Sequence, residues 1–330
     1  MKTQKIIKMG RFVGFMIILC LADVFAGPNV DELFQKAKTD IEQNNVDVAI
    51  PLLDAILASG DTNDILRIRT HRLRAGVLHF KNPESAKSDL DSAIMIAKRL
   101  IAERLNGNTN LSQDYLIAVS DNYGAALRYA ILLLCRDGKD NEAASMYQSY
   151  SVDVLKLGPL FDESGKQKIV YFANKGWLKA AQIMVDAKQI SEAHNIYANA
   201  GEVLSNLDWT TPEITEKAVY TMQMGALITS DVNDKLFGIA AAELIEKNKT
   251  KSWIVHSSID VIERISFERQ YELYTGLIKA QPTSVKDHSM ALLYHLAYTT
   301  AKEIGRPEEA VIYYKTLKQK YPNESVSAVP

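Results

Sequence analysis

Apolar residues recur along most of the chain at the spacing of an amphipathic helix. In successive windows they fall at positions i, i+3, i+4 and i+7, which places them on one face of a helix. Alternating runs rich in valine, isoleucine and threonine are nearly missing, and no Asn-Gly turn joins two such runs. The pattern therefore predicts an all-α fold.

Turn-forming residues separate these apolar windows and divide the chain into successive helices. No proline- or serine-rich linker interrupts the series, so we expect one continuous helical domain over residues 27–330. The breaks fall at Ser59-Gly60-Asp61, Asn82-Pro83, Asn106-Gly107-Asn108, Asp137-Gly138, Gly158-Pro159, Asp231-Val232-Asn233, Gln281-Pro282 and Gly305-Arg306-Pro307.

The first 26 residues differ from this pattern. A basic leader is followed by the apolar run FVGFMIILCLADVFAG (residues 12–27), which ends in small residues. These are the features of a secretory signal peptide, and we predict cleavage after about Ala26. The run is shorter than the roughly 20 residues that a membrane span needs, so an uncleaved signal that anchors the protein is the alternative.

The clearest repeated pattern lies near the C-terminus, in EIGRPEEAVIYYKTLKQKYPNE (residues 303–324). Tyr294 precedes Ala310 by 16 positions, Gly305 marks a turn between them, and Tyr314 and Pro322 follow. Small residues let the two helices of a hairpin approach closely, and an aromatic residue four positions after the alanine fills the gap to a neighbouring helix. The segment therefore predicts a helical hairpin.

The same offset of 16 residues recurs between a large or polar residue and an alanine elsewhere in the chain. The pairs are Leu33 and Ala49, Thr70 and Ala86, Leu127 and Ala143, and Trp177 and Ala193. We therefore predict repeats near residues 30–60, 67–100, 124–151, 174–205 and 291–324, and a degenerate region at 206–290 that includes a divergent hairpin at 206–250.

This pattern resembles the tetratricopeptide repeat. The resemblance covers most of the chain after residue 26, and its motifs are distinct over about half of that length. It implies an α-solenoid in which antiparallel helix hairpins stack into a superhelix. In this family, ligands dock in the concave groove lined by the first helix of each pair.

Composition and charge agree with an ordinary globular protein. The chain has 330 residues, of which 47% are hydrophobic and 24% charged. The net charge of −2 gives no reason to expect nucleic-acid binding. Removal of residues 1–26 takes away four basic residues and one acidic residue, which makes the net charge −5. It also leaves Cys135 as a single cysteine, so an internal disulfide is excluded. We predict that Cys135 is a small residue of the core.

No catalytic signature is found, and we predict that the protein is not an enzyme. The sequence contains no H-E-x-x-H, no G-x-S-x-G and no glycine-rich dinucleotide turn. The six histidines form no metal-ligand cluster, so no metal or other cofactor is expected. Asp89 and Asp91 suggest an acid pair, but they face apart on a helix and read as surface charges.

The resemblance places a partner-binding face on the first helix of each hairpin. Its central part is basic in an acidic protein, which favours an acidic or extended peptide segment of a partner. A solvated face with scattered charges is the alternative. The lysine-and-asparagine clamp of the family's chaperone-binding members is not reproduced. The residues expected on this face are Phe34, Lys38, His71, His79, Arg128, Arg136, Lys175, Leu178, Gln182, His295, Thr299 and Lys302.

Taken together, the patterns favour a non-enzymatic, exported scaffold that binds a protein or peptide partner during cell-envelope assembly or secretion. The basic leader favours the periplasm of a Gram-negative bacterium, although three glycosylation sequons keep a eukaryotic secreted origin open. One alternative is a polysaccharide-export or polymer-binding helical-repeat protein, in which exposed Trp209 and Trp253 would line the groove. Another is an enzyme whose site lies in 206–290.

Overall fold

The computed structural model describes residues 29–60, 62–261, 265–282 and 285–328. Across these ranges the chain forms α-helices and two short 3-10 helices, with no strand. The predicted all-α fold is therefore confirmed. The predicted signal peptide, residues 1–26, lies outside the described residues.

The described residues from Asn29 to Ala93 belong to one compact unit. Its helix α3 packs against both α2 and α4. The core between them is apolar and consists of Phe34, Ala37, Leu53, Ile56 and Leu66. The helices of this unit are α2 (Val30–Glu42), α3 (Val46–Ala58), α4 (Asp64–Leu78) and the first part of α5 (Pro83–Leu105).

The described residues from Ile94 onward belong to a second compact unit. It contains the rest of α5, the long helices of the central region and the C-terminal helices. These are α6 (Gln113–Arg136), α7 (Asp140–Leu155), η1 (Gly158–Leu160), α8 (Glu163–Asp186), α9 (Ile190–Ser205), α10 (Pro212–Ile228), α11 (Asp234–Asn248), α12 (Ile254–Ile259), α13 (Phe267–Ala280), α14 (Asp287–Glu303), α15 (Pro307–Lys320) and η2 (Ser325–Ala328).

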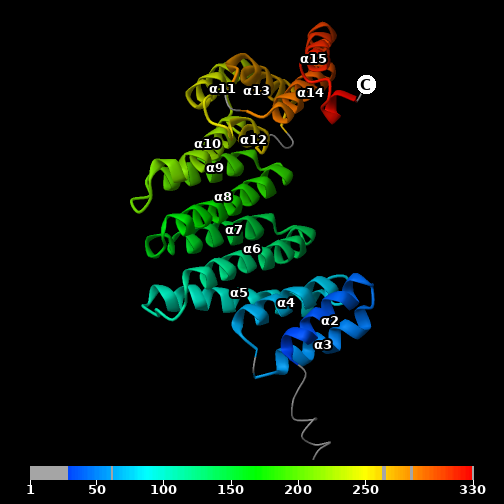
Figure 1. The fold of residues 1–330 in the computed structure, drawn as a ribbon, viewed down its shortest axis with the longest axis vertical. Helices are drawn as coiled ribbons and strands as arrows, with labels where there is room; N and C mark the ends of the chain where they lie inside the picture. Colours follow the sequence, from blue (N-terminus) through cyan, green and yellow to red (C-terminus); the bar gives the residue numbers. More distant parts are fainter. Residues whose placement is uncertain (1–28, 61, 262–264, 283–284, 329–330) are drawn as a thin grey trace, which may run out of the picture. The chain divides into compact units, whose positions relative to one another are not determined.

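Helices of the second unit pack mainly against their neighbours in the chain. From α6 to α10, each helix contacts the next, and short turns make successive helices antiparallel (Figure 1). Alternate helices also touch, because α8 contacts α6 on one side and α10 on the other. This order confirms the predicted stack of antiparallel helix hairpins.

The region without the repeat signature departs from simple pairing. The sequence predicts a divergent hairpin over 206–250, but α10 packs more against α9 than against α11. Helix α11 packs instead against α13, because its buried residues Phe237, Ala241 and Ile245 share a core with Leu273 and Leu277. The intervening α12 is a helix of six residues.

Four hairpin turns share one backbone device. Each has a residue in the left-handed conformation five positions before the alanine of its predicted repeat, and the next residue donates its N–H to the carbonyl five positions back. These hydrogen bonds satisfy carbonyls that the end of a helix leaves unpaired. The left-handed residues are Asn44 (φ 62°), Gly138 (φ 71°), Lys188 (φ 61°) and Gly305 (φ 73°).

The aromatic residues of the predicted repeats pack largely as the sequence indicates. Tyr147, Trp177 and Tyr197 are buried. Tyr314 is half-buried, and its ring centroid lies 5.2 Å from that of Tyr298. These side chains supply contacts within the core.

Candidate functional site

The N-termini of α6 and α8 are tied together by two residues. The Gln113 side chain donates from Nε2 to Asp162 Oδ1 at 3.0 Å and accepts from the Asp162 N–H at 2.9 Å. Asp162 Oδ1 also caps α8 by accepting from the Gly165 N–H at 2.8 Å. The hydrogen bond from the Gly165 N–H has the largest effect on the Asp162 carboxyl, followed by the one from Gln113 Nε2. Both hold its pKa below the ordinary value. The first helices of two hairpins are thereby aligned at one end.

Glycines bring the helices around α8 and α10 into close contact. A Cβ atom at Gly176 of α8 would lie 2.2 Å from Ser151 Oγ on α7, and one at Gly225 of α10 would lie 2.4 Å from Tyr197 Cδ1 on α9. The absence of a side chain is therefore required at both positions. The close packing fixes how α8 and α10 present their other faces.

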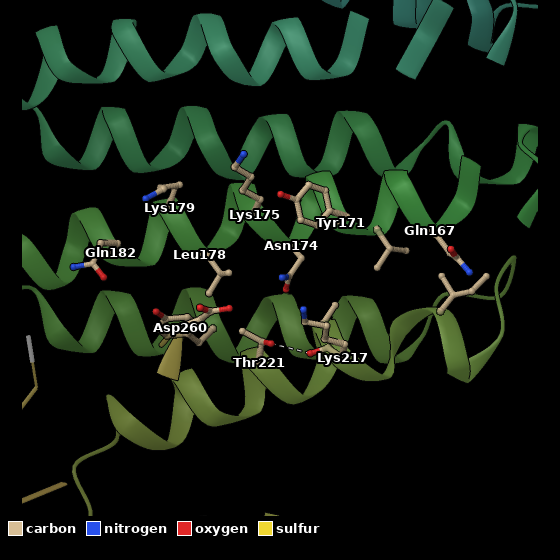
Figure 2. Close-up of a pocket in the computed structure, with 14 residues that line it drawn as sticks. Gln167, Tyr171, Asn174, Lys175, Leu178, Lys179, Gln182, Lys217, Thr221 and Asp260 are labelled. Atoms are coloured by element: carbon tan, nitrogen blue, oxygen red, sulfur yellow. Dashed lines mark hydrogen bonds between the residues drawn. The ribbon is translucent and has the colours of Figure 1, made fainter. Parts of the chain in front are cut away.

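A pocket of about 490 Å³ lies between α8 and α10 (Figure 2). Helix α8 supplies one wall, α10 the other, and Asp260 at the end of α12 closes one side. Its apolar lining is Val170, Leu178, Tyr197, Ile214 and Ala218. Its polar lining is Gln167, Tyr171, Asn174, Lys175, Lys179, Gln182, Lys217, Thr221 and Asp260.

A second, smaller pocket of about 60 Å³ adjoins the first on the α6 side of α8. The two pockets share Lys175 and Lys179. The smaller one is lined further by Asp121 and Arg128 of α6 and by the aromatic rings of Tyr147, Tyr150 and Phe172. Together the two pockets form one groove across α6, α8 and α10, which we call the central groove.

Basic side chains dominate the charge of the central groove. Arg128, Lys175, Lys179 and Lys217 face it, against the carboxylates of Asp121 and Asp260. None of the four cations forms an ion pair with a residue of the described ranges. Lys175 Nζ instead lies 5.8 Å from the centroid of the Tyr171 ring, which is 58% exposed. The groove therefore carries a local excess of positive charge in an acidic protein.

Asn174 adds a hydrogen-bonding group at the centre of the larger pocket. Its Oδ1 atom is buried and accepts no hydrogen bond from any described residue. A buried acceptor without a donor is costly, so an incoming N–H or O–H group would stabilise it. Figure 2 shows the side chain extending from α8 toward α10.

The buried tyrosines of the groove remain uncharged at neutral pH. Burial raises the pKa of Tyr150, and the nearby Asp121 carboxylate adds to that effect. Burial also raises the pKa of Tyr147, against a smaller lowering effect of Arg128. The charge of the groove therefore comes from its lysine, arginine and aspartate side chains.

The structure brings together some of the residues that the sequence places on the binding face. Arg128, Lys175, Leu178 and Gln182 all line the central groove. Arg136 does not line it, because it stands at the end of α6, where its Nε lies 3.4 Å from Asp137 Oδ1.

The predicted binding residues of α14 form a separate group. Lys302 Nζ lies 5.3 Å from the centroid of the Tyr298 ring, and His295 and Thr299 are half-buried on the same helix. Burial lowers the pKa of His295, so its imidazole stays neutral at physiological pH. This group is aromatic and weakly basic, and it lines neither pocket of the central groove.

Four predicted binding residues lie in the first unit. Phe34 is 6% exposed and belongs to the apolar core, with the Arg69 guanidinium 5.6 Å above its ring. Lys38 pairs with Glu42 at 3.7 Å. His71 and His79 are half-buried, and the Nδ1 atom of His79 lies 2.7 Å from the Gly76 carbonyl oxygen.

Asp89 corrects one expectation from the sequence. It is 2% exposed, whereas the helix pattern suggested a surface charge. Its carboxylate accepts from Arg74 Nε at 2.7 Å and Nη2 at 2.9 Å, and it lies 2.8 Å from His71 Nδ1. Its hydrogen bonds and its charge raise the pKa of Arg74. The paired guanidinium compensates for the buried charge, which explains why the carboxylate is tolerated inside the unit.

The sequence did not place several of the groove residues on the predicted binding face. Lys217 and Thr221 lie in the segment 206–250, which has no repeat signature to fix their orientation. Tyr171 and Asn174 precede the first aligned position of their repeat, Trp177. Lys179 lies one helical turn after Lys175. This i+4 spacing places both lysines on the same face of the helix, so the sequence could have indicated Lys179 as well.

The described residues offer little catalytic chemistry outside the groove. No group of three or more histidine, cysteine or acidic side chains in the described ranges is placed to hold a metal ion. In the region 206–290, His256 Nε2 lies 2.8 Å from the buried Ser289 Oγ. Neither residue lines either pocket of the groove. Burial and a hydrogen bond with Asp140 raise the pKa of Cys135 to about 11, which makes this partly exposed thiol a poor nucleophile at neutral pH.

Trp209 and Trp253, which a polymer-binding groove would expose, pack against other residues of the chain. The Trp209 ring covers Gly158, where an added Cβ would lie 2.3 Å from the ring. The Trp253 ring centroid lies 5.3 Å from that of Tyr220. Both side chains are half-buried, and neither lines the central groove.

Comparison with known proteins leaves the groove as the main guide to function. Neither the known family models nor the curated proteins include a match to this chain. Within the described part of the chain, every helix is too short or too polar to span a membrane.

Proposed function

We propose that the chain is an exported, non-enzymatic scaffold of the tetratricopeptide-repeat type that binds a protein or peptide partner in the central groove. The observation that best supports this proposal is a set of basic side chains on α6, α8 and α10. They have no ion-pair partner among the described residues. They line a pocket of about 490 Å³ with an apolar floor. Positive charge beside apolar surface suits an acidic partner segment that also carries apolar side chains.

The mechanism is docking, with no covalent step. Opposite charges on the partner and the groove steer the encounter, and burial of apolar side chains against Leu178 and Ile214 then stabilises the complex. The polar side chains of Asn174 and Gln182 supply hydrogen bonds that orient the bound segment.

The predicted signal peptide supports the cellular setting of this proposal. An exported helical stack suits assembly or secretion in the cell envelope, and a Gram-negative periplasm fits the basic leader. Contact with a membrane would come through an uncleaved signal.

The two other functions receive less support. Polymer binding by stacked sugars would use exposed tryptophans in the groove, and Trp209 and Trp253 pack elsewhere. An enzymatic site in 206–290 would need acids and histidines that converge on a cavity, whereas the His256–Ser289 pair lines neither groove pocket.

Site-specific crosslinking tests the proposed function. A photoreactive amino acid at Gln167, which lines the groove, is expected to crosslink a defined partner in an envelope fraction. The same amino acid at Lys315, an exposed position of α15, serves as the control site. Reversal of two groove charges in the double variant Arg128→Glu, Lys175→Glu is expected to reduce crosslinking at Gln167 at least about tenfold, because attraction becomes repulsion.

The matched charge control is Lys315→Glu, which changes the net charge outside the groove. Crosslinking at Gln167 should persist in this variant. If the double variant captures the same partner as strongly as the unaltered protein, the groove is not the binding site.

A further inference from the structure

The cations of the central groove come from three alternate helices. Arg128 lies on α6, Lys175 and Lys179 on α8, and Lys217 on α10. Helix α8 contacts both α6 and α10, and its Lys175 and Lys179 line both pockets, between Arg128 of the smaller pocket and Lys217 of the larger one. We call these four cations the row. A segment that follows this row meets a new basic position each time it passes from one helix to the next.

Helix packing fixes the spacing of the row. The axes of contacting helices lie about 8–10 Å apart. A chain in polyproline-II conformation rises about 3.1 Å per residue and completes a turn in about three residues, or roughly 9 Å. Every third side chain of such a segment would therefore point at the groove and arrive at the next helix. An extended β-strand does not fit as well, because its side chains at i and i+3 point to opposite faces.

The rest of the lining suits the same conformation. A polyproline-II segment has no internal hydrogen bonds, so its backbone N–H groups are free to donate to the buried Asn174 Oδ1. The exposed ring of Tyr171 and the apolar side chains of Leu178 and Ile214 offer surface for proline rings or other apolar residues.

From these observations we propose that the groove binds a partner segment in polyproline-II conformation that carries aspartate or glutamate at every third position. The three acidic side chains of a bound segment pair with Arg128, with Lys175 or Lys179, and with Lys217. The proposal rests on the proposed function and adds the conformation and charge spacing of the partner.

Synthetic peptides test the spacing directly. The first probe has three consecutive Asp-Pro-Ala triplets, and its isomer has the same composition with the aspartates contiguous. Both carry a fluorophore and blocked termini, so that no terminal carboxylate contributes. Fluorescence anisotropy with the full chain is expected to show at least about tenfold tighter binding of the spaced peptide at low salt. The difference should disappear at about 1 M salt, because screening weakens the ion pairs.

Charge-swapped pairs test the register. Lys217→Glu should weaken binding of the spaced peptide, whereas Lys315→Glu should leave it unchanged. Replacing one terminal aspartate of the peptide by lysine should restore binding to the Lys217→Glu variant. Replacing the central aspartate should not, because that position faces α8. Restoration by the central replacement would overturn the assigned register and with it the proposal.

The outcomes separate this inference from the function on which it rests. Equal affinity for the two isomers would overturn the proposed spacing of acidic residues. The same conclusion would follow if neither peptide bound while a photoreactive residue at position 167 still crosslinked a partner. In either case the groove remains a binding site. Loss of both peptide binding and crosslinking overturns both proposals. Polygalacturonate that displaces the spaced peptide at equal carboxylate concentration would show that charge density, and not peptide conformation, is recognised.

Discussion

Tyr197 connects the core of a hairpin with the floor of the central groove. Its side chain is 3% exposed, and its ring lies against the backbone of α10 at Gly225. The same residue lines the larger pocket. A change that displaces this ring therefore affects both the packing of α9 against α10 and the shape of the binding surface.

Gly201 of α9 and Gly225 of α10 make a matched test of this contact. Gly225→Ala places a Cβ 2.4 Å from Tyr197 Cδ1, so we expect a loss of about 1–3 kcal/mol in the free energy of unfolding. Gly201→Ala places a Cβ 3.4 Å from Met222 Cβ, an ordinary contact. Because alanine favours a helix over glycine, this variant should be stabilised by up to about 1 kcal/mol. Urea unfolding of both variants measures the difference, and equal destabilisation would contradict it.

At the scale of single elements, the hairpin turns repeat one geometry with different residues. Gly138 and Gly305 adopt a positive φ freely, whereas Asn44 and Lys188 occupy the same turn position with a side chain. A left-handed residue with a Cβ costs about 1–2 kcal/mol, least for asparagine. Lys188 is therefore the strained member of the set.

Substitution at Lys188 tests this strain. Lys188→Gly should raise the free energy of unfolding by about 0.5–1 kcal/mol, because relief of strain exceeds the added entropy of the unfolded chain. The opposite change, Gly305→Ala, should destabilise the protein by about 1 kcal/mol. Thermal unfolding followed by circular dichroism checks both values. A destabilised Lys188→Gly variant would show that the lysine side chain has a stabilising contact that outweighs the strain.

These turns also show what the sequence could predict and why. Gly138 and Gly305 mark their turns, but lysine is not a turn-forming residue, so the turn at Lys188 gave no local signal. In the groove, Arg128 and Lys175 followed from the repeat register, whereas Lys217 did not, because α10 has no such signature. The buried Asp89 was missed because its partners, Arg74 and His71, lie on another helix.

At the scale of the whole molecule, the described helices pack mainly against their neighbours in the chain. In such a structure, stability is approximately a sum of local terms and interfaces between neighbours. The apolar cluster that joins α10 to α14 is one such set of interfaces, and Leu293 is fully buried within it. A cavity there should weaken nearby helices more than distant ones of the same unit.

Hydrogen exchange tests this locality. Leu293→Ala should reduce the protection of amides in α11, α13 and α14, since a buried leucine-to-alanine change costs about 2–5 kcal/mol. Amides of α6 and α7 should keep most of their protection. Uniform loss of protection across the second unit would instead indicate a single cooperative transition.

The row of groove cations has an evolutionary consequence. The basic positions lie on three alternate helices, α6, α8 and α10, so the length of the recognised segment depends on how many such helices line the groove. Duplication of one hairpin would lengthen the recognised segment by about three residues, and deletion would shorten it by the same amount. Binding specificity could thus diverge between descendants through the number of repeats, while every remaining contact in the groove stayed the same.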